Sequence, residues 1–130
     1  MLFRSGVLHQ HPNLKLVLAH GGGYLPAYSG RIDHGASARP DTCEQLRHMP
    51  TTYLRRLYFD ALVFTDHQLQ YLVDLYGADH VLVGTDYPAD MGEIDPIGFI
   101  ERAPGLDDAE RRAILGRNAA RLLNIEIPRA

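Results

Sequence analysis

Residues 57–84, LYFDALVFTDHQLQYLVDLYGADHVLVG, decide the fold because two apolar runs in them flank one helical pattern. The runs cover 57–62 and 81–84, and the second is nearly continuous, which is typical of a strand buried on both faces of a parallel sheet. Between the runs, four apolar residues share one face of a helix: Leu69, Leu72, Val73 and Tyr76. We therefore predict a strand–helix–strand unit whose two strands pair in parallel, since a crossover joins them.

End signals place this helix at 66–76. Thr65 and Gln68 match a capping box at its start. Gly77 stands where a carboxyl-terminal cap is expected.

Two further helices are predicted near the end of the chain. Asp107 with Glu110 resembles a second capping box, leading into a helix over 109–115. A last helix is predicted over 118–123.

A third strand is predicted over 15–19, and it ends abruptly at His20 and three glycines. The strand over 81–84 ends in the same way, at Thr85 and Asp86. Ligands of parallel α/β folds bind at the carboxyl ends of the strands. We therefore expect His20 and Asp86 to converge at one rim of the sheet, where they can serve a shared cation.

Each of these residues has a structural alternative. His20 can be a strand-end histidine bonded to a backbone carbonyl, or it can be a general acid/base or metal ligand. Asp86 can be a turn or helix-cap residue, or it can be a carboxylate ligand of a divalent metal. Asp60, at the end of the run over 57–62, has either a buried hydrogen-bonding role or a role in the pocket.

The motif His-Gly-Gly-Gly at 20–23 also occurs in the oxyanion hole of esterases. That interpretation requires a Gly-x-Ser-x-Gly elbow, and the serines of the chain are Ser5, Ser29 and Ser37. Because none of them lies in such an elbow, the esterase interpretation is disfavoured.

The segment 30–50 lacks clean periodicity and is interpreted as a long functional loop with a short helix or two. Arg31, His34 and Arg39 crowd it. Two arginines and a histidine suggest a clamp for an anion or carboxylate, and a solvated loop is the alternative.

Composition excludes several classes of protein. The chain has 130 residues, 45% hydrophobic and 22% charged, with a formal net charge of −3, which fits one soluble globular domain without an electrostatic footprint for nucleic acid. No apolar run is long enough to span a membrane. The single cysteine, Cys43, rules out an internal disulfide and a cysteine-based zinc site, and it fits a cytoplasmic setting.

Several motifs together resemble those of a known family. They are LAHGGG at 18–23, GRIDHG at 30–35, YFDAL at 58–62, VGTDYP at 83–88 and NAARLL at 118–123. In this order they resemble the carboxyl-terminal part of the metal-dependent amidohydrolase-related decarboxylases (the amidohydrolase 2 family).

The resemblance implies an α/β fold, the (β/α)₈ TIM barrel, with one divalent metal, zinc by expectation, at its carboxyl face. Asp86 would be a metal ligand, and His20 would activate the metal-bound water and move protons. Arg31 would bind the carboxylate of a small-molecule substrate, reaching into the neighbouring subunit of a homodimer. The implied reaction is the non-oxidative loss of CO₂ from an unsaturated or aromatic carboxylic acid. A metal and a neighbouring histidine suit proton transfer at neutral pH.

Such a barrel typically needs about 250 residues. We therefore expect residues 1–130 to form a partial barrel domain, about its last three β/α units, without its N-terminal half. The family's His-x-His pair and a further ligating histidine are missing from the expected positions, so we expect the chain alone to be inactive. Its open sheet edges predict self-association or binding of a complementary half. The alternatives are a metal-dependent hydrolase of the same superfamily and a non-catalytic half-barrel remnant.

Overall fold

The computed structural model describes residues 5–127, which form two compact units. Within the described range, unit 1 contains residues 5–16 and 24–57, and unit 2 contains residues 17–23 and 58–127. The chain therefore enters unit 2 briefly, returns to unit 1, and then completes unit 2.

Unit 2 is built on a three-stranded parallel sheet with the order β1-β2-β3. The strands are β1 (Val17–Leu18), β2 (Tyr58–Asp60) and β3 (Val81–Leu82). In the ladder, Val17 lies opposite Tyr58 and Phe59 lies opposite Val81. The predicted parallel pairing is confirmed, although each strand is shorter than its apolar run. Pairing of β1 ends before the left-handed turn that begins at His20.

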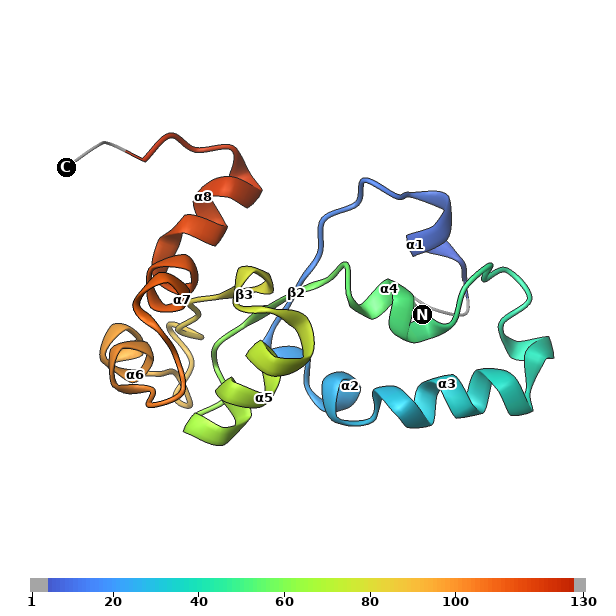
Figure 1. Cartoon of the computed structure of the whole chain (residues 1–130), viewed down its shortest axis with the longest axis horizontal. Helices are drawn as coiled ribbons and strands as arrows, with labels where there is room; N and C mark the ends of the chain where they lie inside the picture. Colours follow the sequence, from blue (N-terminus) through green and yellow to red (C-terminus); the bar gives the residue numbers. More distant parts are fainter. Residues whose placement is uncertain (1–4, 128–130) are drawn as a thin grey trace. The chain divides into compact units, whose positions relative to one another are not determined.

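Helix α5 (Asp66–Tyr76) packs on this sheet and has the predicted bounds (Figure 1). Its four predicted core residues are buried, and the ring of Tyr76 lies 4.5 Å from that of Phe59 in β2. Gly77 ends the helix with φ 89°. The predicted capping box is wrong, because the Thr65 hydroxyl donates to Gln68 Oε1 at 2.7 Å and accepts no backbone N–H.

One continuous helical segment near the end of the chain takes the place of the two predicted helices. It consists of α7 (Asp108–Arg112), the π-helical segment η4 (Ala113–Arg117) and α8 (Asn118–Leu123). The π-helical turns bridge the expected gap without leaving helical geometry. The capping box of Asp107 and Glu110 is confirmed. Unit 2 also contains η1 (His20–Gly22), η3 (Ala78–His80) and α6 (Pro96–Arg102).

Asn118 fastens this helical segment to the sheet. Its side chain is 1% exposed, and Nδ2 donates to the carbonyl oxygens of Ala78 and Val81 at 2.7 Å each. Arg121 adds a bond to the carbonyl of Asp79 at 2.8 Å. The NAARLL motif therefore has a structural role, because it binds the turn that leads into β3.

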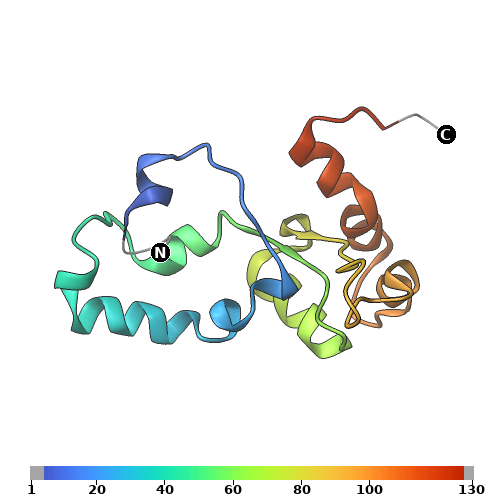
Figure 2. The ribbon, with the colours of Figure 1, turned by 180° about the vertical axis from the view of Figure 1, so that it is seen from behind.

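Unit 1 is helical. It contains α1 (Val7–Gln10), α2 (Tyr24–Ala27), α3 (Ser29–Ala38), η2 (Pro40–Thr42) and α4 (Pro50–Leu54). Helices α3 and α4 lie side by side in both views (Figures 1 and 2). Asp33 of α3 accepts bonds from the backbone N–H and the hydroxyl of Thr51 in α4, at 3.0 and 2.6 Å.

The expectation of a long loop with a short helix or two over 30–50 is confirmed in part, because α3 and η2 lie there, but α3 with its ten residues makes the first part more helical than expected. None of these residues is buried, so α3 leaves no apolar periodicity to find in the sequence. Its packing on α4 through Asp33 is a tertiary contact. Within the part of the chain that the structure describes, no helix combines the length and apolar character needed to cross a membrane.

Candidate active site

His20 and Asp86 meet at the carboxyl edge of the sheet in unit 2. His20 begins η1 after β1, and Asp86 lies in the loop after β3. His20 Nε2 lies 3.4 Å from Asp86 Oδ1, and the two side chains are 62% and 34% exposed. The structure therefore brings together two side chains that follow β1 and β3, the strands on either side of β2.

Both residues have a left-handed backbone, with φ 56° at each. This conformation costs of order 1–3 kcal/mol for a residue other than glycine. An ion pair between exposed side chains contributes only about 0–1 kcal/mol. The stability of the fold therefore does not account for this pair, and strained residues of this kind cluster at functional sites.

Asp60 lies between the two strand ends and has a half-buried hydrogen-bonding role. Its Oδ1 accepts from the backbone N–H of Gly21 at 2.8 Å and from that of Leu62 at 3.2 Å. Gly21 has φ 58°, and a Cβ at this position would overlap the side chain of Val63. The lack of a side chain at Gly21 therefore lets Val63 approach this turn closely.

The donor atoms of this site suit a divalent metal in kind but not in number. Asp86 offers a carboxylate and His20 an imidazole. Among residues 5–127, no cluster of three or more histidine, cysteine or acidic side chains could hold a metal ion. A catalytic zinc site has three protein ligands. A complete metal site therefore needs ligands beyond those that the described residues bring together.

Arg31 lies on α3 of unit 1, and its side chain is exposed. His34 follows it by three residues and is exposed as well. Arg39 pairs with Asp41 at 3.4 Å instead of lying free. The clamp proposed for these three residues stays a prediction, because exposed side chains fit both a clamp and a solvated surface.

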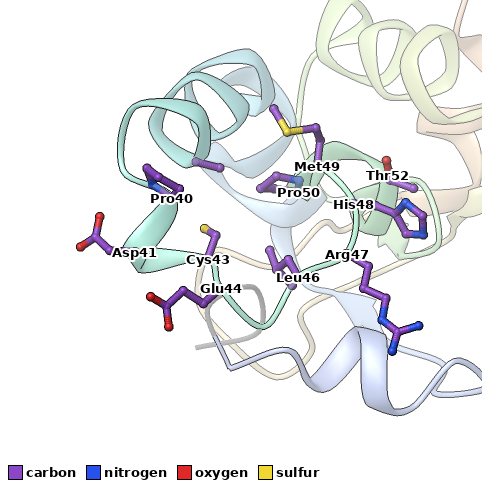
Figure 3. Close-up of a pocket in the computed structure, with 11 residues that line it drawn as sticks. Pro40, Asp41, Cys43, Glu44, Leu46, Arg47, His48, Met49, Pro50 and Thr52 are labelled. Atoms are coloured by element: carbon purple, nitrogen blue, oxygen red, sulfur yellow. The ribbon is translucent and has the colours of Figure 1, made fainter.

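Unit 1 also contains an open hollow of about 1000 Å³ that the sequence did not reveal (Figure 3). Residues between 36 and 52 line it, but Arg31 and Arg39 do not. Cys43 and Met49 lie at its wall. Its lining mixes charged and apolar side chains without a repeat, so no pattern in the sequence signals it.

Comparison with known proteins identifies the family. The sequence profile described as Amidohydrolase matches residues 1–125. The chain belongs to the amidohydrolase family. The resemblance that the sequence motifs indicate is therefore confirmed.

Several relatives of this amidohydrolase chain are decarboxylases. The 2-amino-3-carboxymuconate-6-semialdehyde decarboxylase of Dictyostelium discoideum is 39% identical over 97% of this chain and 35% of its own length. The crystal structure of 5-carboxyvanillate decarboxylase from Sphingomonas paucimobilis matches with a TM-score of 0.85 and 28% identity, over 96% of this chain and 38% of that one.

A third relative contains a metal. The dihydroxybenzoic acid decarboxylase of Polaromonas sp. JS666 was solved with bound manganese and the inhibitor 2-nitroresorcinol. It matches with a TM-score of 0.75 and 28% identity, over 95% of this chain and 37% of that one. The amidohydrolase chain thus spans a little over a third of the length of these relatives.

Proposed function

We propose that this chain is the carboxyl-terminal portion of a metal-dependent, non-oxidative decarboxylase that acts on an unsaturated or aromatic carboxylic acid. The meeting of His20 with Asp86 at the carboxyl edge of a parallel sheet carries the proposal. Its membership of the amidohydrolase family and the decarboxylases among its relatives support it.

In this proposal the three strands are the last part of a (β/α)₈ barrel, with residues 1–130 as one partial domain. Parallel sheets are normally covered on both faces and continued at their edges. The sheet order leaves β1 and β3 at the two edges. The remaining strands would continue the sheet there and bring the missing ligands to the same rim.

Asp86 would hold the divalent metal through its carboxylate, together with ligands from the rest of the barrel. The metal would supply positive charge that orients the substrate and lowers the pKa of a nearby water. We expect zinc, with manganese as the competing ion because the Polaromonas relative contains it.

His20 would deliver the proton that replaces CO₂. When the bond between the substrate carbon and its carboxylate breaks, the electron pair stays on that carbon and takes a proton from Nε2 of His20. Histidine suits this step because its ordinary pKa of about 6.5 lets it gain and lose a proton near neutrality. The exposed imidazole of His20 can be protonated again from solvent.

Arg31 would bind the substrate carboxylate, and in the complete enzyme it would do so across a homodimer interface. Its planar guanidinium can grip a carboxylate through two parallel hydrogen bonds. The exposed position of Arg31 on α3 is compatible with that role. A cytoplasmic location, suggested by the single cysteine, belongs to the same proposal.

A chimera tests the proposal. The aligned segment of the Dictyostelium relative is replaced by this chain, and CO₂ release from candidate carboxylic acids is measured together with the metal content. We expect a chimera that retains metal and releases CO₂. Asp86→Ala should abolish metal retention, whereas His20→Ala should keep the metal and lower turnover by about 10²–10⁴-fold.

Matched controls use exposed residues of α5, His67→Ala for the histidine and Asp74→Ala for the carboxylate, and both should leave metal and turnover unchanged. Full turnover in His20→Ala, or full metal retention in Asp86→Ala, would refute the assigned roles. Hydrolysis without CO₂ release would instead place the chain among the hydrolases of the family. A folded chimera without activity would favour the non-catalytic remnant.

A further inference from the structure

Asp60 contacts the ends of both strands that carry the candidate site. On one side, its Oδ1 accepts the backbone N–H of Gly21, the residue directly after His20. On the other side, it packs against Gly84, two residues before Asp86. The carboxylate at the end of β2 therefore lies between the two segments whose side chains meet.

The contact with Gly84 leaves no room for a larger residue. A Cβ built on Gly84 would lie 2.8 Å from Asp60 Cβ and 3.1 Å from its Cγ. The first of these distances is shorter than the 3.0 Å to which real Cβ atoms essentially never approach another heavy atom. Gly84 thus lets the end of β3, two residues before Asp86, come up to Asp60.

The two site residues do not hold each other. The His20 side chain is largely exposed and that of Asp86 partly exposed, and the attraction of a solvent-accessible pair is only about 0–1 kcal/mol. The turn after His20 consists of Gly21, Gly22 and Gly23, all with positive φ. Glycine adopts such angles easily, and no side chain of these residues holds the turn in place. A hydrogen bond to an ionised carboxylate is stronger than a neutral one, so the bond from Gly21 to Asp60 is suited to fix this turn.

We propose that Asp60 is a positioning residue that sets the separation between His20 and Asp86. Asp60 acts through the backbone of Gly21 on one side and of Gly84 on the other. The purpose of the separation rests on the proposed function, but the separation itself is a property of this chain.

NMR of the whole 130-residue chain, with its histidines isotopically labelled, tests whether His20 and Asp86 are in contact. The ring signal of His20 is assigned as the one that disappears in His20→Gln. Spectra of all variants are recorded at the same pH, so that only the substitutions differ. In the parent chain, Asp86→Asn should shift the His20 ring signal, because it removes a negative charge 3.4 Å away. In the background of Asp60→Ala this response should be lost.

Two variants separate positioning from general structural damage. Asp60→Asn keeps an oxygen that can accept from Gly21, so it should rescue the response. Asp33→Ala removes a carboxylate that, like Asp60, is half-buried and accepts a backbone N–H, but in unit 1. It should leave the response intact.

A response that persists in a folded Asp60→Ala chain would overturn the proposal, as would a parent chain in which Asp86→Asn shifts nothing. If Asp60→Ala does not fold, Gly84→Ala takes its place, since the added methyl group pushes the end of β3 away from Asp60. An unchanged response in Gly84→Ala would then refute the proposal. Because no activity is measured, failure of the decarboxylase proposal and failure of this one remain distinguishable.

Discussion

Replacement of Asn118 by alanine tests whether one buried amide fastens the helical segment of unit 2 to the sheet. The substitution removes two hydrogen bonds of 2.7 Å, to the carbonyls of Ala78 and Val81. A lost hydrogen bond costs about 1 kcal/mol net where the acceptor keeps another partner, and about 1–3 kcal/mol where a buried acceptor is left without one. The carbonyl of Ala78 still accepts the N–H of Val81, so that penalty applies mainly to the carbonyl of Val81. We expect a loss of about 2–4 kcal/mol in the free energy of unfolding.

Urea unfolding followed by far-ultraviolet circular dichroism measures this loss. With a slope of about 2 kcal/mol per molar urea, the midpoint should fall by about 1–2 M. Asn118→Asp keeps the volume but turns an acidic oxygen toward two carbonyls, so it should destabilise at least as much. Asn13→Ala is the control, because Asn13 is exposed. A midpoint for Asn118→Ala equal to that of the control would refute the reasoning.

Three further predictions concern local features. Gly21→Ala should lower the free energy of unfolding by about 2 kcal/mol or more, because it combines a positive φ with overlap of a valine methyl, whereas Gly35→Ala, in α3 with open space around it, should cause no loss; thermal unfolding compares the two. Asp107→Ala removes two capping bonds, to the N–H groups of residues 109 and 110, and should cost about 1 kcal/mol in urea unfolding; an unchanged midpoint would count against the cap. The hydrogen bond from Arg102 and one from a backbone N–H of α6 hold the pKa of Asp95 below its ordinary value. This carboxylate therefore stabilises the fold at a pH above its pKa in the unfolded chain. The stabilisation is lost as the pH falls through the pKa of Asp95 in the folded chain. Arg102→Met should raise the pKa of Asp95 toward the ordinary value in an NMR titration, and an unmoved pKa would contradict the assigned cause.

The correct parts of the fold prediction rest on patterns between residues that are close in the sequence. Helix α5 has the predicted bounds because its apolar face and Gly77 lie within the helix or next to it, although the capping box predicted at Thr65 does not form. Parallel pairing followed from the short crossover between two apolar runs. The length of helix α3 could not be predicted from the sequence, because the helix buries none of its residues and is bound through Asp33 to Thr51, 18 positions away.

The candidate site likewise has features that the sequence predicts and features that depend on the tertiary structure. His20 and Asp86 could be singled out because each ends an apolar run, and the carboxyl ends of parallel strands meet at one edge. The left-handed backbone at both residues and the bond from Gly21 to Asp60 were not visible, since they depend on how three strand ends approach one another.

The amino-acid sequence by itself therefore determined the family, the parallel pairing of the strands and the two side chains at the strand ends, because these follow from motifs and periodicities within short stretches. Only the tertiary structure decided the 3.4 Å approach of His20 to Asp86 and the position of Asp60 between their strands. Such distances arise from contacts between residues tens of positions apart, where the absence of a Cβ at Gly84 or one hydrogen bond to Gly21 sets the spacing.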